Sequence, residues 1–367
     1  MRESWKYFAV RTIDMLLAVM IIALIISAFF VTFREENQEE AIQRQVKGEI
    51  KNIDFEDPDE AYEYREERIH ELREENDLDG PRAERILDNA VDMITFKFGR
   101  TERLTTPGRE RNQQINEVIM AYLPYTILLF TTAAAIYTVL AIFVGLKTAQ
   151  MAGSSIDKFL TVVSASLSSA PLWWTGMIFM LIFSAELGWY PTPEPTFPTV
   201  RSLGYLGYMK ELLIKMSLPL FTIVIVKFGG RLLVSRNLVT RILEEDYIIA
   251  ARAKGLPERK IIYGHVLKTA SPPIMTTAVL ALLTSLGGAL IAEVVFQWPG
   301  IGYLLRRALY EPLPHSGETA TFEDRLIISI TFVLVVISVV GLYITDMIYG
   351  YLDPRVSVGS KFGEGKR

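Results

Sequence analysis

The 367-residue sequence contains no cysteine. A disulfide framework and a thiolate metal or redox site are therefore excluded. Its three histidines, His70, His265 and His315, are far apart in the sequence, so no metal site is expected. The formal net charge is −4, and the basic residues are not concentrated in one soluble segment. We therefore expect no nucleic-acid partner.

The sequence also lacks the phosphate-binding pattern G-x-x-x-x-G-K-[ST], so the chain cannot bind ATP through that loop. Its large acidic segment has no recognisable Ser/His/Asp, metal or phosphate constellation. These absences predict a protein that is not itself an enzyme, with no catalytic residues and no cofactor.

What the sequence does contain is a strict separation of apolar and charged blocks. About 20 apolar residues cross the ~30 Å hydrocarbon core of a bilayer as a helix. Six blocks approach or exceed this length, which predicts an all-α membrane protein with six transmembrane helices: Ile13–Phe33, Val118–Val144, Phe159–Leu187, Leu212–Val226, Ile274–Phe296 and Ile327–Tyr349.

Some residues within these blocks carry separate predictions. Pro171 is expected to kink the third span. The pair Gly229-Gly230 is expected to permit close helix packing. Lys227, Arg231 and Asp346 are expected to reach the nearby cytoplasmic interface by snorkelling.

The blocks divide the chain into four parts. Residues 1–33 form a cytoplasmic N-terminus and the first span, and residues 352–367 form a cytoplasmic tail. Residues 34–117 contain 24 acidic and 14 basic residues, which predicts a solvated, extracellular helical insert between spans one and two. Residues 118–351 form a core with five spans. Short loops rich in Lys and Arg stay in the cytoplasm, which places both termini and the basic loop at 235–273 on that side.

The basic loop contains the stretch "DYIIAARAKGLPERK", which starts at Asp246. Alanine favours a helix, Gly255 suits the left-handed residue that ends one, and Pro257 suits the start of the next. The pattern predicts a helix, a tight turn and a second helix. Two interpretations remain open from spacing alone: a docking surface for another protein, or an amphipathic helix lying on the membrane.

A second candidate site lies at the outer end of the fifth span, where Glu293 precedes Trp298, Pro299 and Gly300. A carboxylate in an apolar span usually faces protein or water. These four residues therefore form either an outer gate in a transport pathway or a structural hydrogen-bonding corner. The structural interpretation is favoured, because burial of charge near the interface costs little.

The basic loop resembles the EAA loop of binding-protein-dependent ABC importer permeases. Ala250, Ala251, Gly255 and Leu267 match that pattern, whereas Ile249, His265 and Lys268 replace its Glu, Ile and Pro. With these departures, the loop resembles the version found in the dipeptide/oligopeptide/nickel subfamily, whose segment reads like "DYVRTARAKGL". Further resemblances, in the same order along the chain, are "YLPYTILL", "LGWYP", "GGALIAEVVFQWPGIGYLLRRA" and "DMIYGYLDPRV".

The resemblance implies a type I permease fold and one half of a translocation pathway for peptides or similar small solutes. It implies three kinds of partner besides the lipid bilayer: a second permease, two ATP-binding subunits and an extracellular substrate-binding protein. The turn would receive the conformational work of ATP hydrolysis from those subunits. The residues expected in this coupling are Asp246, Tyr247, Ala250, Ala251, Arg252, Lys254, Gly255 and Leu256.

Two other classes compete with this interpretation. A secondary transporter driven by an ion gradient is expected to show an internal repeat and paired broken helices at the midplane, and the sequence has no such repeat. A membrane-anchored receptor or enzyme would need a functional constellation in the acidic insert. The transported solute is beyond what the sequence predicts.

Overall fold

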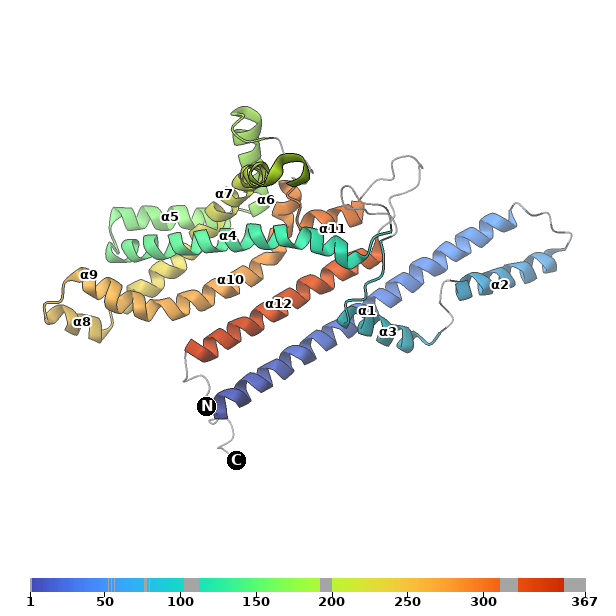
Figure 1. Ribbon diagram of the computed structural model, residues 1–367, viewed down its shortest axis with the longest axis horizontal. Helices are drawn as coiled ribbons and strands as arrows, with labels where there is room; N and C mark the ends of the chain where they lie inside the picture. Colours follow the sequence, from blue (N-terminus) through green and yellow to red (C-terminus); the bar gives the residue numbers. More distant parts are fainter. Residues whose placement is uncertain are drawn as a thin grey trace.

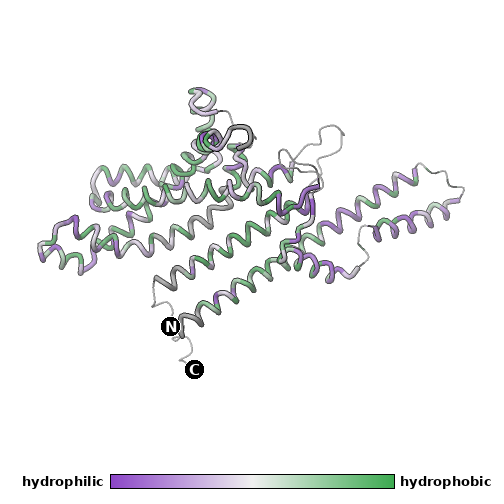
Figure 2. The backbone as a smooth tube through the Cα atoms, viewed as in Figure 1, coloured by the Kyte–Doolittle hydropathy of each residue, from purple (hydrophilic) through white to green (hydrophobic). Residues whose placement is uncertain are grey.

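The computed structural model describes residues 2–51, 53, 55, 57–75, 78, 80–101, 112–191, 200–310 and 323–352. This part of the chain is helical throughout, and its only β feature is an isolated bridge between Arg100 and Gln114. The helices run side by side and form an elongated bundle (Figure 1). Apolar residues fill the long central helices, and hydrophilic residues concentrate at the two ends (Figure 2).

The first helix, α1 (Arg2–Ile50), is much longer than the apolar block within it. Its 49 residues correspond to ~74 Å, more than twice the hydrocarbon thickness. The helix does not stop where the apolar residues stop at Phe33, because the Glu, Gln, Arg and Ala residues that follow are also strong helix formers. The predicted boundary at residue 34 is therefore a change of surface along one continuous helix.

The insert folds back against this extension of α1. Helix α2 (Pro58–Glu75) packs on it through a small apolar cluster that includes Ile42, Val46 and Leu72. Ion pairs reinforce the contact, with Arg73 Nη1 3.1 Å from Glu39 Oε1. Helix α3 (Arg82–Ile94) lies beside α1 nearer the bundle. The expected helical insert is thus present as two helices held against α1.

The remaining spans form the core. They are α4 (Ile115–Gln150), the bent pair α5 (Ser155–Ser169) and α6 (Leu172–Phe179), α7 (Val200–Leu243), α10 (Leu267–Val295) and α12 (Asp324–Leu352). Each predicted apolar block lies largely within one of these helices or within the bent pair. The π-helical turn η1 (Met180–Glu186) continues α6. Shorter helices are α8 (Asp246–Ala253), α9 (Glu258–Lys260) and α11 (Ile301–Tyr310), and a second π-helical turn, η2 (Ile261–Val266), follows α9.

The third span is sharply bent. The axes of α5 and α6 differ by 98°, and Pro171 is the residue immediately before α6. The predicted kink at Pro171 is confirmed. Because proline has no amide hydrogen, it cannot continue the hydrogen bonding of α5 and instead begins a new helix.

Four described helices are long and apolar enough to span a membrane by themselves, and the bent pair brings the number to five. The predicted all-α membrane fold is confirmed, and the count of six spans stays a prediction. Most exposed apolar side chains lie on these helices, as expected for surfaces that face lipid or partner spans. The start of α1 and the end of α12 are neighbours, since Arg11 Nε lies 3.6 Å from Asp346 Oδ2.

Candidate functional site

The basic loop forms the helix, turn and helix that the sequence predicts, at one extremity of the bundle (Figure 1). Helix α8 carries the residues from Asp246 to Ala253, and α9 begins at Glu258 after Pro257. The π-helical turn η2 joins α9 directly to α10. Residues 258–295 are therefore one continuous helical stretch that connects the exposed turn to a long membrane helix.

Gly255 ends α8 in the left-handed conformation, with φ of +76°. The Gly255 N–H donates to Arg252 O at 2.9 Å, and the Leu256 N–H donates to Ala251 O at 3.3 Å. This pair of bonds is the Schellman arrangement that closes a helix end. It satisfies carbonyls that would otherwise lack partners, and it fixes the angle between α8 and α9. The predicted role of Gly255 in the turn is confirmed.

The faces of α8 differ in exposure. Tyr247 and Ile249 are about half exposed, and Ala250 is also exposed, whereas Ile248 is fully buried. Ala251 was expected on the contact surface, but it is buried against the apolar cluster beneath the loop. Leu256 packs against the same cluster, so these two side chains support the exposed surface from below. Asp246, Arg252, Lys254 and Gly255 remain accessible, as expected.

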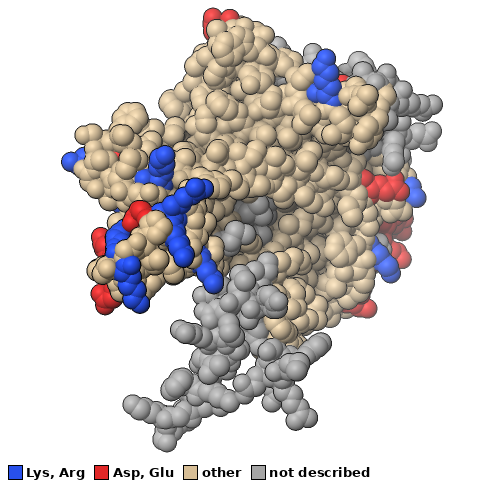
Figure 3. All heavy atoms as spheres, turned by 60° about the vertical axis from the view of Figure 1, so that its left-hand side comes forward, with Lys and Arg blue, Asp and Glu red and all other residues tan. Residues whose placement is uncertain are grey.

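Charge around the turn is mainly basic at its tip, where Lys and Arg side chains gather on one face (Figure 3). One ion pair ties the turn together: Arg252 Nη2 lies 2.7 Å from Glu258 Oε1. The Arg252 guanidinium donates hydrogen bonds to this carboxylate and holds the pKa of Glu258 below its ordinary value. Lys254, Arg259 and Lys260 are exposed and remain available to an outside partner.

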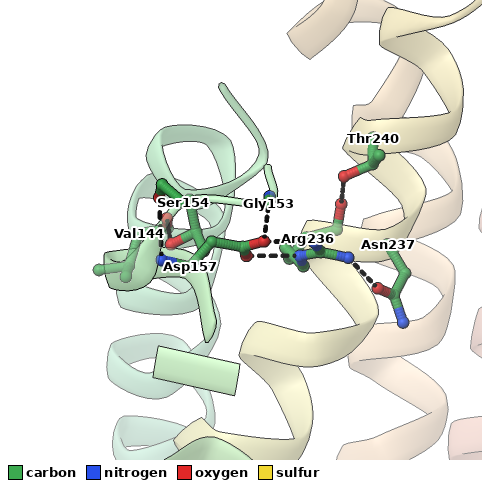
Figure 4. Close-up of polar contacts among 8 residues, drawn as sticks. Val144, Gly153, Ser154, Asp157, Arg236, Asn237 and Thr240 are labelled. Carbon is green, nitrogen blue, oxygen red and sulfur yellow. Dashed lines mark hydrogen bonds and ion pairs between the residues drawn. The ribbon is translucent and has the colours of Figure 1, made fainter. Parts of the chain in front are cut away.

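A second polar cluster fastens the turn between α4 and α5 to α7 (Figure 4). The Asp157 carboxylate is buried, and it accepts from Arg236 Nε at 2.9 Å and from Arg236 Nη2 at 2.6 Å. It also accepts from the Gly153 N–H at 2.9 Å, while the Ser154 hydroxyl caps α5 by accepting from the Asp157 N–H. The sequence alone does not predict this pair, because its partners are 79 residues apart. The isolated aspartate at the start of an apolar helix was the available signal.

The second candidate site is a packed corner where α10 meets α11. Glu293, Trp298, Pro299 and Gly300 are all buried. The Glu293 carboxylate accepts from the Gly302 N–H at 2.5 Å, and it thereby caps the first turn of α11. Gly300 lies so close to this carboxylate that an added Cβ would overlap it.

The aromatic member of this corner is held from a neighbouring span. Trp298 donates through Nε1 to Tyr125 O at 3.0 Å, and the two rings meet edge to face. The contacts within the chain are those of the structural interpretation. A role of these residues in a gate stays a prediction.

Sequence similarity to known proteins supports this helical membrane architecture. Residues 137–358 match the family described as binding-protein-dependent transport system inner membrane component. The chain is 29% identical over 279 residues to the oligopeptide transport system permease protein AppB of Bacillus subtilis, covering 76% of this chain and 82% of that protein. It is 26% identical over 307 residues to the di/tripeptide transport system permease protein DppB of Pseudomonas aeruginosa, covering 79% and 84%.

The fold defines a multi-span helical membrane component with an exposed helical turn at one end. The chain belongs to the family of binding-protein-dependent transport system inner membrane components. It is a permease subunit of an ABC importer, and the ion-driven secondary transporter is not supported. The permease fold that the sequence analysis inferred by resemblance is thereby confirmed.

Proposed function

We propose that this permease imports peptides, that it pairs with a second permease, and that two ATP-binding subunits dock on the turn between α8 and α9. Peptides are the solutes in the names of the two relatives described above. A substrate-binding protein would deliver them on the opposite side of the membrane. The chain contributes the pathway and the mechanical connection, and its partners contribute ATP hydrolysis.

The observation that carries the proposal is the continuous helical stretch of residues 258–295. A partner that moves α8 and α9 would also move the start of α10, because α9, η2 and α10 follow one another with no flexible loop in between. The buried cluster of Ile248, Ile261 and Val266 makes the element rigid. Closure of the ATP-binding subunits would therefore tilt a membrane helix and favour one pathway conformation over another.

The proposed orientation places α8 and α9 in the cytoplasm and α2 and α3 outside. Exposed basic residues at the turn support it, because short loops rich in Lys and Arg remain in the cytoplasm. The start of α1 and the end of α12 lie toward the same end of the bundle as this turn (Figure 1). Both termini would then be cytoplasmic, and residues 34–117 would form an extracellular insert.

The turn can be tested with Gly255→Val in the complex reconstituted with its partner permease, ATP-binding subunits and binding protein. A Cβ at Gly255 would meet no atom within 4 Å, so the substitution acts through backbone strain. A β-branched residue in the left-handed region costs about 2 kcal/mol or more, which opens the turn. We expect insertion and assembly to persist, and stimulation of ATP hydrolysis by the dipeptide-loaded binding protein to be lost.

Two variants control for strain. Gly255→Asn should retain stimulation, because asparagine tolerates the left-handed conformation. Gly188→Val introduces the same kind of strain at a glycine with φ of +62° that follows η1 and not α8, and it should leave coupling intact. Normal stimulation in Gly255→Val would refute the coupling role. Failure of the wild-type complex to take up any dipeptide or longer peptide would refute the proposed solute class.

A further inference from the structure

The bend in the third span borders a partly open hollow of about 530 Å³. Its wall consists of the end of α5 and the start of α6, together with parts of α7 and α10. The residues used below are Ser168, Ser169, Trp173, Lys227 and Gly230. Binding sites for small organic molecules commonly occupy about 300–1,000 Å³, so the hollow has the size of a small-solute site.

Among the described residues of this wall, Lys227 is the only one with an ionisable side chain. Within the described part of the chain it has no ion-pair partner. The sequence explains why, since the four helical segments around the hollow contain only four acidic residues: Asp157, Glu186, Glu211 and Glu293. Asp157 pairs with Arg236, Glu211 pairs with Lys215, and Glu293 caps α11, whereas Glu186 is exposed beyond the far end of α6.

The hollow lies part-way along the bundle. The pair of Asp157 and Arg236 lies beside the turn between α4 and α5, and α7 continues past it to Leu243. Lys227 is nine residues before Arg236 on α7, or ~13 Å along the helix, and sixteen residues before Leu243, or ~24 Å. Ser169 is twelve residues beyond Asp157, or ~18 Å. Lys227 therefore lies well inside its helix and not at its end.

The expectation that Lys227 snorkels to the cytoplasmic interface stays a prediction. The expectation assumed that the fourth span ends at Val226, but α7 continues to Leu243. The helix tolerates two of the charges beyond Val226 because each has a partner in the fold. Arg231 is buried and donates through Nη2 to Ile274 O at 3.1 Å, and Arg236 pairs with Asp157. Lys227 has only the hollow. An unpaired charge on a membrane helix is costly unless it faces the bundle interior or a water-filled cavity.

We propose that the hollow is a solute-binding position within the translocation pathway, and that Lys227 binds the carboxylate group of the passing solute. This inference rests on the proposed import function and deepens it. The lysine ammonium supplies the charge. The hydroxyls of Ser168 and Ser169 already donate to Ala165 O, each at 2.9 Å, so both oxygens present lone pairs to donor groups of the solute. Trp173 adds an apolar surface that is 43% exposed.

Because the chain contains no cysteine, the charge of the hollow can be measured without transport. A single Ser168→Cys substitution in the reconstituted complex would be labelled with an anionic and with a cationic methanethiosulfonate of similar size, and the mass of this chain followed. We expect the anionic reagent to react faster, because it approaches a positive charge in a poorly screened cavity. The ratio of the anionic to the cationic reaction rate should be about tenfold higher than the same ratio at a cysteine with no charge nearby.

Adding Lys227→Gln to Ser168→Cys should abolish that preference, and Lys227→Arg should preserve it. Lys210→Gln is the matched control, since Lys210 is an exposed lysine on the same helix, and it should change nothing. An anionic preference that persists in Lys227→Gln, or one that is missing from the parent variant, would overturn the proposal. This readout does not depend on the identity of the solute, so it separates the inference from the import of peptides.

Transport provides the second readout, with alanyl-alanine and its carboxyl-terminal amide as probes in complexes that have assembled normally. Lys227→Gln should slow import of the free acid by about tenfold while changing import of the amide little, so that the difference between the two solutes disappears. Equal loss for both probes would overturn the proposal. Failure of the complex to assemble would also overturn it, since it would indicate that Lys227 pairs with the second permease instead.

Discussion

The contact between Asp157 and Arg236 allows one quantitative prediction about how the membrane helices are held together. Arg236→Met removes both guanidinium hydrogen bonds and keeps most of the aliphatic stem. The Asp157 side chain is only 4% exposed, so its carboxylate would retain a single bond from Gly153 and little water. Breaking a buried pair from one side costs about 3–5 kcal/mol, and we expect about 3.

The reverse substitution should cost less. Asp157→Asn removes the charge but keeps an oxygen that can still accept from the Gly153 N–H. The Arg236 side chain is 22% exposed and also donates to Asn237 Oδ1, so it can partly satisfy itself with water. We expect a loss of about 1.5 kcal/mol. The asymmetry follows from which partner is more deeply buried.

The double variant decides whether the two groups act on each other. Its destabilisation should fall short of the sum of the single variants by about 2 kcal/mol, since neither charge is then left unpaired. The measurement is the unfolding free energy of the full chain in mixed micelles, compared for the four proteins. The coupling should persist at high salt, because a buried pair is poorly screened. Additivity within about 0.5 kcal/mol would refute the reasoning.

Two further predictions concern the packing of α7 and the exposed turn. A Cβ at Gly229 would overlap the Ser164 carbonyl oxygen, whereas a Cβ at Gly230 would lie 3.5 Å from Ser168 Cβ. Gly229→Ala should therefore destabilise the chain by about 2 kcal/mol and Gly230→Ala by much less, as measured by unfolding in micelles; equal effects would contradict the packing. The lowered pKa of Glu258 means that its pairing with Arg252 stabilises the turn above pH 4.5 and is lost as the pH falls through the folded-state value. Both side chains are more than 40% exposed, so the effect should be below about 1 kcal/mol, visible as faster proteolysis of the turn at low pH and absent in Glu258→Gln.

Local chemistry made much of this protein predictable. The apolar blocks, the helix-turn-helix around Gly255 and the bend at Pro171 each depend on residues that are neighbours in the sequence. A left-handed glycine or a missing proline amide acts within one or two helical turns. The pattern along the chain is therefore enough to locate such features.

Boundaries were less predictable than elements. The first helix passes its apolar limit at Phe33 without a break, because charged residues such as Glu and Arg favour helix as strongly as many apolar ones. The fourth span passes Val226 for a different reason, since Arg231 and Arg236 beyond it find partners elsewhere in the fold. Hydropathy reports where a helix meets lipid, and it does not report where a helix ends.

By itself, the sequence determined that this chain crosses a membrane several times and presents a rigid basic turn, because both properties follow from residues within a few positions of one another. Only the tertiary structure decided that Ala251 lies beneath that turn, that Asp157 meets Arg236, and that Lys227 faces a hollow whose described lining contains no acidic residue. These outcomes depend on which helices pack together and at what height. Packing brings together residues that the sequence separates by tens of positions. Composition and periodicity do not indicate which of these distant residues will meet.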